Sequence, residues 1–563
     1  MKRILAGLFL FALMWTSILL PRLPKLDQFV AVDEPAWLVR SANFYYALGQ
    51  RDFARTFQSI HPGVTTMWIE TAAFLIKYPQ YRGFGQGYIE GYRHFDVFMR
   101  SKGMDPHQIL IISRIIAVLI CSLMLLLSAL ILKSFVKTPT LIAIVIMIGF
   151  DPFYMAYSRL AHLDGLESSF LFLSFIACYA YLRYRNRVVY LLLSGGAAAF
   201  AVLTRITGIL IIPVVFGMFL LELMDKYPHW RKQNESWQGF VSEGRGTFLG
   251  LIYWSVFFLG ALVLFWPAVW VDPLRLVSLF TSPMNFASAL ATDPQIRLSS
   301  AGVNINLVFF RSYVWNTTPV TLTAILLALI SYFGRFGQLN SESDRRLITA
   351  SSLFVAVFFG ALALSSKFSM RYSMPAYLVL DVVAAYGIAS IPSILSGWHL
   401  SLKNTVSVLI QGGMLLIYAV GTLQTFPYYL TYYNPLLGGS RRAGETLFIG
   451  YGEGLDEAGR YLAQKPNADQ LTAIAWYGWG CFSYYFPGET NYFSTYLSWA
   501  DFLEKQRSKK ERSDYLVVYT NQWYRRQPPE LFDILDKIKP EHSVWINDIE
   551  YVRIYKVSDI PLP

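Results

Sequence analysis

The sequence predicts an α-helical polytopic membrane protein of about eleven transmembrane helices, with a small α/β domain at its C-terminal end. Of the 563 residues, 54% are hydrophobic and only 15% are charged, which is too much apolar surface for a soluble protein of this size. The formal net charge is +11, yet residues 425–563 carry 15 Lys and Arg against 17 Asp and Glu. The positive excess therefore belongs to the membrane part, which favours anionic membrane lipid as a partner and argues against nucleic acid.

Apolar runs of about the length of a bilayer crossing recur along the first 424 residues. The region 188–224 is predicted to contain two short helices broken at Thr204-Arg205, because about 37 residues are too many for one crossing. The predicted membrane helices are 4–20, 109–132, 139–157, 166–182, 188–203, 207–224, 247–270, 317–333, 347–364, 374–392 and 404–424. We expect the first of them to be retained, because no small-x-small cleavage site follows it.

The first outer loop, residues 21–108, contains helices but no uninterrupted span. Within it, the run 62–78 starts with Pro62 at the first helical position and is interrupted by Glu70, so we predict a helix that lies at the interface.

Charge in the loops predicts the orientation of the chain. If Lys2 and Arg3 are cytoplasmic, every other cytoplasmic loop is basic as well, as the positive-inside rule requires. The opposite side then receives the Asp33 loop and everything after residue 425. It also receives the loops 158–165, 271–316 and 365–373.

Residues 425–563 lack long apolar runs and alternate between short segments, which predicts an extracytoplasmic α/β domain beside a membrane domain of residues 1–424. We expect helices at 454–462 and near 529–539, a buried strand at 515–520, and an edge or half-buried strand at 551–557. The cysteines, Cys121, Cys178 and Cys481, suggest neither a disulfide framework nor a zinc site. The absence of a Walker loop gives no support to ATP-driven transport.

Charged residues gather on the predicted outer face. The carboxylates Asp33, Glu34 and Asp164 are joined there by the cations Arg114, Arg159, Lys367 and Arg371. Transfer of a group from a lipid-linked phosphate requires this combination: cations stabilise the leaving phosphate, and a carboxylate takes the proton of the acceptor. The lipid tail of such a donor stays in the bilayer while its head reacts at the boundary with water.

These residues resemble the pattern of protein O-mannosyltransferases and the related aminoarabinose transferases. The resemblance rests on Asp33-Glu34, the turn His61-Pro62-Gly63, Arg114, and the segment from Ser158-Arg159 to Leu163-Asp164. The Thr204-Arg205 break and the segment Lys367 to Pro375 are similar to bacterial members. Where the eukaryotic pattern has His-Pro-Pro, this chain has His61-Pro62-Gly63, which leaves the acceptor open as a protein hydroxyl, a lipid or a glycan.

The resemblance implies a GT-C glycosyltransferase fold and inverting transfer of a sugar from a polyprenyl-phosphate donor. It implies Asp33 as the catalytic base, Glu34 as the residue that positions the base or the acceptor, and Asp164 as part of the same pocket. It also implies a set of donor-phosphate ligands: Arg114, Arg159, Arg205, Lys367 and Arg371. No cofactor is certain, and a divalent cation is an open alternative, because some GT-C enzymes use one.

Simpler interpretations exist for each of these residues. Asp33 and Glu34 could cap a helix, and Arg159 and Asp164 could pair only with one another. His61 could bind a metal with Asp33, although the turn before a helix explains this stretch as well. For the whole chain, the alternatives are a lipid-linked oligosaccharide transferase or ligase, and a transporter or lipid flippase that performs no covalent chemistry.

Overall fold

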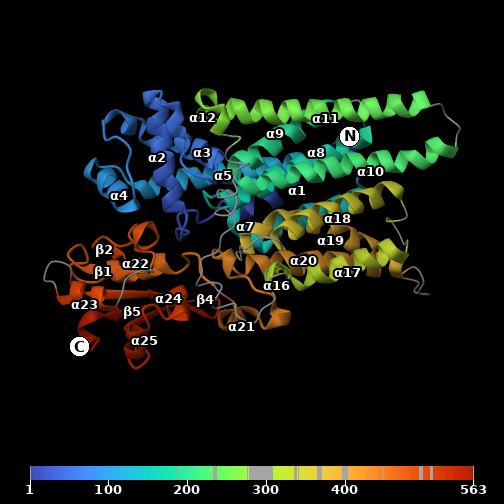
Figure 1. Ribbon diagram of the computed structural model, residues 1–563. Coiled ribbons are helices and arrows are strands. Elements are labelled where there is room, and N and C mark those ends of the chain that lie inside the picture. Colours follow the sequence, from blue (N-terminus) through green and yellow to red (C-terminus); the bar gives the residue numbers. More distant parts are fainter. Residues whose placement is uncertain are drawn as a thin grey trace. The chain divides into compact units, whose positions relative to one another are not determined.

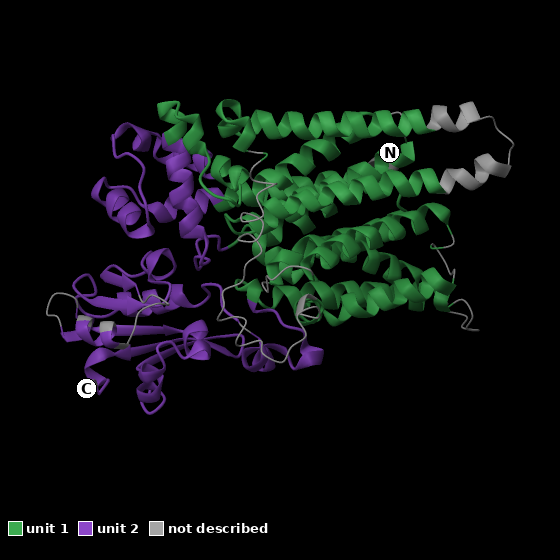
Figure 2. Ribbon diagram, in the orientation of Figure 1, with its two compact units in different colours: residues 1–24, 47–69, 114–430 green, residues 25–46, 70–113, 431–563 purple. Residues whose placement is uncertain are grey.

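The computed structural model describes residues 2–184, 187–232, 237–275, 277, 308–334, 339, 341–363, 370–395, 403–447, 449–492, 499–507 and 512–561. The chain divides into two compact units, which Figure 2 shows in green and purple. Unit 1 comprises residues 1–24, 47–69 and 114–430. Unit 2 comprises residues 25–46, 70–113 and 431–563. The predicted C-terminal domain thus shares a compact unit with two segments of the first outer loop.

Each of the eleven predicted membrane segments is helical (Figure 1). These helices are α1 (Lys2–Leu19), α5 (Pro106–Leu132), α6 (Thr138–Phe150), α8 (Leu163–Tyr184), α9 (Val189–Thr204), α10 (Ile211–Lys232), α11 (Trp237–Phe265), α17 (Pro319–Gly334), α18 (Glu342–Ala363), α19 (Met374–Ile394) and α20 (Lys403–Leu423). Shorter helices of unit 1 are α7 (Pro152–Tyr157), α12 (Pro267–Val271) and α16 (Val308–Asn316).

Not every helix is long enough to cross a bilayer alone. Within the described part of the chain, seven helices pass a test of length and hydropathy, or eight if the pair α16 and α17, bent by 120°, counts as one broken span. The helices α6 and α9 are apolar but shorter. The protein is therefore a multi-pass membrane protein, as the composition predicts, with seven or eight full-length spans by this measure.

The predicted continuous span 139–157 is wrong, because Asp151 divides it into α6 and α7. Asp151 has φ −58° and ψ 117°, outside the helical region, and its side chain accepts a hydrogen bond from the backbone N–H of Tyr154 at 2.6 Å. Pro152 follows at the first position of α7. An Asp cap followed by proline is a strong start signal for a new helix, and it overrides the apolar run.

Two helices form the interior of unit 1. In α8 and α19, 94% of the apolar window is buried within the protein, compared with 22% in α11 and 17% in α20. The helix α8 contacts α9, α10 and α19, while α19 also contacts α6, α17 and α18. Side chains at the start of α8 are consequently enclosed by protein, and the outer helices present their apolar faces to lipid.

The predicted break at Thr204-Arg205 is confirmed. The helix α9 ends at Thr204, Arg205 is extended with φ −151° and ψ 144°, and the short 3₁₀ helix η4 (Ile206–Leu210) leads into α10. Gly208 lies in η4, and a Cβ there would meet the Ala201 carbonyl carbon at 2.6 Å. This close packing against α9 keeps the break compact.

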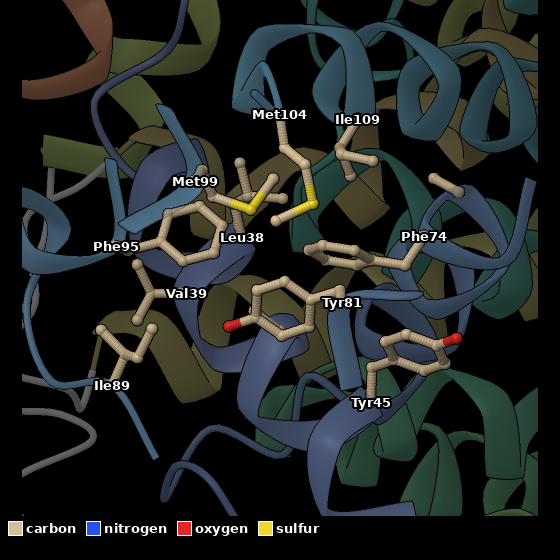
Figure 3. Packing of buried hydrophobic residues seen from close by; sticks show 12 residues of the cluster. Leu38, Val39, Tyr45, Phe74, Tyr81, Ile89, Phe95, Met99, Met104 and Ile109 are labelled. Carbon is tan, nitrogen blue, oxygen red and sulfur yellow. The ribbon is translucent and has the colours of Figure 1, made fainter. Parts of the chain in front are cut away.

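Residues 21–108, predicted to form the first outer loop, contribute three helices, α2 (Glu34–Gln50), α3 (Val64–Lys77) and α4 (Tyr92–Ser101). As predicted, none of them is long and apolar enough to span a membrane. Within unit 2, α2 and α4 share a buried cluster with the end of α3, in which Tyr45 stacks on Phe74 at 5.6 Å and Phe74 lies against Tyr81 (Figure 3).

The predicted start of α3 is wrong by two residues, because the helix begins at Val64. Gly63 has φ +61°, which a right-handed helix does not accept, and its N–H donates to the Thr204 carbonyl at 3.0 Å. Pro62 therefore lies before the helix and not at its first position.

The C-terminal part of unit 2 contains a five-stranded sheet in the order β2-β1-β3-β5-β4. The strands are β1 (Thr472–Ala475), β2 (Glu489–Tyr492), β3 (Tyr515–Tyr519), β4 (His542–Ile546) and β5 (Ile549–Lys556). Strands β2, β1 and β3 are parallel neighbours, and β5 is antiparallel to β3 and β4. The helices of this part are α21 (Gly439–Thr446), α22 (Leu455–Ala463), α23 (Trp499–Arg507), α24 (Thr520–Arg525) and α25 (Pro529–Leu535).

The sequence predictions for this part are confirmed for α22, α25 and the buried strand β3. For residues 551–557 the sequence allowed an edge or a half-buried strand, and the edge alternative is wrong, because β5 lies between β3 and β4. Its alternating pattern reflects two faces of different burial, and the same pattern is compatible with an edge or a central position.

Candidate functional site

Asp164 lies in the first turn of α8, where a tight turn precedes the helix. Gly165 allows this turn, because a Cβ there would lie 2.6 Å from the Tyr157 carbonyl oxygen. Asp164 is 1% exposed and accepts a hydrogen bond from Nη1 of Arg205, while His162 Nδ1 lies 2.7 Å from its other oxygen. The turn therefore fixes a buried carboxylate between a cation and an imidazole.

Arg205 reaches Asp164 from the break after α9. Its guanidinium lies over the Tyr372 ring at 4.0 Å and 3.7 Å from Oε2 of Glu167, whose other oxygen accepts a hydrogen bond from Thr207. Arg205 is 3% exposed, so charge neutralisation by the carboxylates is what makes its burial tolerable.

Two further predicted residues lie at this cluster. Arg371, in the 3₁₀ helix η7 (Met370–Ser373), interacts electrostatically with both Asp164 and Arg205. The turn that contains His61 is joined to the same break, because Gly63 N–H donates to the Thr204 carbonyl and the hydroxyls of Thr65 and Thr204 lie 2.6 Å apart. Unit 1 thus brings together Asp164, Arg205, Arg371 and the His61 turn.

Arg159 belongs to a second, cationic group. Its guanidinium donates to the carbonyls of Arg22 and Pro427, each at 3.1 Å, and of Pro24, and it lies 5.0 Å from the Tyr429 ring. Burial lowers the pKa of Arg159 to about 10, and the neighbouring cations Arg114 and Arg22 act in the same direction. Three positive charges therefore lie near one another in unit 1.

Arg22 is a residue that sequence reasoning missed. It is fully buried and donates to the carbonyls of Ile18 and Gly149, at 2.5 and 3.0 Å, and to the Ser158 hydroxyl at 2.9 Å. An arginine just after an apolar helix is ordinary at a membrane edge, so no sequence signal distinguishes it. Arg22 thus binds the backbone at the ends of α1 and α6, and its own carbonyl accepts a hydrogen bond from Arg159.

Asp33 and Glu34 belong to unit 2, at the start of α2. Glu34 is fully buried and its side chain accepts the Ala31 N–H at 2.8 Å, which closes the turn before the helix. Asp33 is half-buried, and its Oδ2 accepts a hydrogen bond from the Tyr451 hydroxyl at 2.9 Å. The capping interpretation thus fits Glu34, while the carboxylate of Asp33 is bound by a tyrosine from the C-terminal part of unit 2.

The role of Lys367 as a phosphate ligand and the binding of a divalent metal ion both remain predictions. Lys367 lies outside the described residues. Among the residues that the structure describes, no group of three His, Cys, Asp or Glu side chains gathers as metal ligands would, and His61 belongs to unit 1 while Asp33 belongs to unit 2. We therefore derive no step that involves a metal ion.

Residues 98–240 match the family model of dolichyl-phosphate-mannose-protein mannosyltransferase. The matched region includes Arg114, Arg159, Asp164 and Arg205 but not Asp33, and it confirms the resemblance over about a quarter of the chain. No curated protein matches the chain.

Several solved structures resemble the chain at low sequence identity. ArnT from Cupriavidus metallidurans in the apo state is 11% identical with a TM-score of 0.47 and full coverage of both chains. ArnT bound to undecaprenyl phosphate is 12% identical with a TM-score of 0.43 and 98% coverage of both chains. The Archaeoglobus fulgidus oligosaccharyltransferase in complex with Zn and sulfate is 11% identical with a TM-score of 0.46, covering 92% of this chain and 68% of that one.

Proposed function

We propose that this protein is an integral membrane glycosyltransferase that transfers a sugar from a polyprenyl-phosphate donor to an extracytoplasmic acceptor, with inversion. The observation that carries the proposal is a group of buried charged residues in unit 1. Arg205 forms an ion pair with Asp164, and Arg114 lies close enough to Arg159 to lower its pKa. All four residues lie inside the region that matches the mannosyltransferase family model. Buried ionisable groups in membrane proteins generally mark functional sites.

The chemistry explains why cations are needed. The acceptor oxygen or nitrogen attacks the anomeric carbon, the bond from that carbon to the phosphate oxygen breaks, and the electron pair leaves with the phosphate. The phosphate then carries one more negative charge than in the donor, and nearby cations stabilise the transition state in which this charge develops. The proton of the acceptor passes to Asp33, which acts as the general base.

The orientation belongs to the same proposal. The basic loops support a cytoplasmic N-terminus, and the acidic balance after residue 425 supports an extracytoplasmic C-terminal region. Asp33 then acts on the outer side, where a polyprenyl-phosphate sugar presents its head group.

The test uses the full chain in vesicles that contain a polyprenyl-phosphate sugar labelled in both the lipid and the sugar. Membranes from cells that lack the chain supply acceptors. We expect the wild type to release labelled polyprenyl phosphate, and Asp33→Asn to lose about 10²- to 10⁴-fold in rate while still binding donor. The control is Asp27→Asn, an exposed carboxylate of the same loop, which should retain the wild-type rate.

Three results contradict the proposal. Normal turnover by Asp33→Asn rejects Asp33 as the base. Movement of intact donor across the bilayer without release of polyprenyl phosphate identifies a flippase, and a requirement for a pyrophosphate-linked donor identifies an oligosaccharide transferase or ligase.

A further inference from the structure

The segment that carries Asp33 is bound by a loop from the C-terminal part of unit 2. The Val32 N–H donates to the Tyr451 carbonyl at 3.1 Å, and the Tyr451 hydroxyl donates to Oδ2 of Asp33 at 2.9 Å. One residue, 418 positions along the chain from Asp33, thus contacts both the backbone and the carboxylate of this segment.

The loop has a sequence suited to this close approach, Gly450-Tyr-Gly-Glu-Gly454. All three glycines have positive φ, +102°, +118° and +84°. A Cβ on Gly452 would lie 2.2 Å from the Val30 carbonyl oxygen, so a side chain at this position would push the Asp33 segment away. The glycines therefore allow the loop to curve tightly and the two backbones to touch.

The loop is itself held firmly by the sheet. Glu453 is 2% exposed, and its Oε2 accepts from the Tyr451 N–H at 2.6 Å and from the Tyr519 hydroxyl at 3.1 Å. The Gly452 N–H donates to the same hydroxyl at 2.8 Å, and Asn521 Nδ2 donates to the Gly450 carbonyl at 3.1 Å. Because Tyr519 ends β3, the position of Tyr451 is fixed by the sheet.

Two phenols of unit 2 also act on Asp33. Tyr92 on α4 and Tyr477 after β1 interact with Asp33 electrostatically, and burial raises the pKa of both phenols, so they stay neutral in acid. Arg40 interacts electrostatically with Tyr92, and the adjacent carboxylate of Glu34 accepts from the Ala31 N–H. The Tyr451 hydroxyl, by contrast, donates a hydrogen bond to the Asp33 carboxylate itself.

We propose that Tyr451 is a positioning residue for Asp33, so that the C-terminal part of unit 2 completes the catalytic apparatus. The inference rests on the proposed function. The hydrogen bond restrains the orientation of the Asp33 carboxylate, and it favours the ionised form that a general base requires. The loop 450–454 thereby aligns the base before the acceptor arrives.

The test compares wild type, Tyr451→Phe and the control Tyr461→Phe, whose hydroxyl instead donates to Glu541 on the surface. In the vesicle assay with doubly labelled polyprenyl-phosphate sugar, we expect Tyr451→Phe to lower kcat about 10- to 100-fold with an unchanged KM for donor. The acidic limb of its pH profile should move to higher pH, because the carboxylate has lost a donor that favours ionisation. Tyr461→Phe should match the wild type in all three quantities.

A second measurement tests the docking without catalysis. Amide hydrogen exchange of the full-length protein should show Val32 protected in the wild type and in Tyr451→Phe, since the backbone bond remains. Gly452→Ala should expose this amide and lower kcat. An unprotected Val32 amide in the wild type overturns the inference, and so do a wild-type kcat and pH profile in Tyr451→Phe. Failure of the wild type to release polyprenyl phosphate rejects the proposed function instead, and the two failures are thus distinguished.

Discussion

Asp96 provides a pH dependence whose size follows from the structure. It lies on α4, is 6% exposed, and accepts two long hydrogen bonds, from Ser483 at 3.4 Å and from the Tyr484 hydroxyl at 3.3 Å. Burial raises its pKa from 3.8 to about 6, although Arg100 and the two hydroxyls oppose this shift. A difference of about two pKa units corresponds to about 3 kcal/mol between the protonation states.

The direction of the pH effect on stability follows from the linkage between proton binding and folding. The folded state binds the Asp96 proton more tightly than the unfolded chain, so above pH 6 folding carries the full cost of a buried, ionised carboxylate. As the pH falls through 6 towards 4, the folded state takes up a proton and this cost disappears. We therefore expect Asp96→Asn to stabilise unit 2 by up to about 3 kcal/mol at pH 7.5 and to have little effect near pH 4.

The stability of unit 2 can be measured through Cys481, because its buried thiol lies two residues before Ser483 and becomes accessible to a labelling reagent when this region opens. Urea-dependent labelling of this thiol in the full-length protein, followed by mass spectrometry of its peptide, reports the opening of unit 2. Comparing Asp96→Asn with the wild type at each pH cancels the intrinsic pH dependence of thiol reactivity. The exposed Asp469→Asn serves as the matched control and should change nothing. An equal effect of Asp96→Asn at both pH values, or destabilisation at pH 7.5, refutes the reasoning.

Two further predictions concern unit 1 and are measured as thermal unfolding in detergent. Arg205→Met leaves Asp164 buried without the arginine that pairs with it and should lower the free energy of unfolding by about 3–5 kcal/mol. The control Arg245→Met removes an exposed arginine and should change it by almost nothing. Equal effects of the two variants would argue against a buried pair. Gly387→Ala places a Cβ 1.8 Å from a carbonyl oxygen of α17 and should lower the free energy of unfolding by about 1–3 kcal/mol or more. The control Gly360→Ala has open space around its Cβ and should be neutral or stabilising. A neutral Gly387→Ala would show that α17 and α19 can separate freely.

Local sequence signals predicted much of the fold. Each apolar run predicted to cross the membrane contains a helix in the described part of the chain, because a chain in lipid must satisfy its backbone within each helix. The same arithmetic found the break at Thr204-Arg205, and a run of apolar residues found the buried strand β3. At two positions a second local signal overrides the one used for prediction. Asp151-Pro152 ends the apolar run 139–157 as a single helix, and the positive φ of Gly63 moves the start of α3 beyond Pro62.

For the candidate site, the sequence identified some of the residues, and the structure showed which of them contact one another. Charge on the predicted outer face selected Asp164, and the family resemblance added Arg205. The tertiary structure paired the two side chains across 41 positions. No local pattern could predict that Arg22 is buried at the end of α1, because its acceptors lie on α1 and, more than a hundred residues away, at the end of α6.

The sequence by itself determined the membrane class, the helical segments and the acidic pair at Asp33. Only the tertiary structure decided that the first outer loop shares a unit with the C-terminal sheet and that Tyr451 holds Asp33. The physical reason is that hydropathy and periodicity describe neighbours along the chain. A hydrogen bond between residues 418 positions apart depends on the packing of whole elements, and here on three glycines that let two backbones touch.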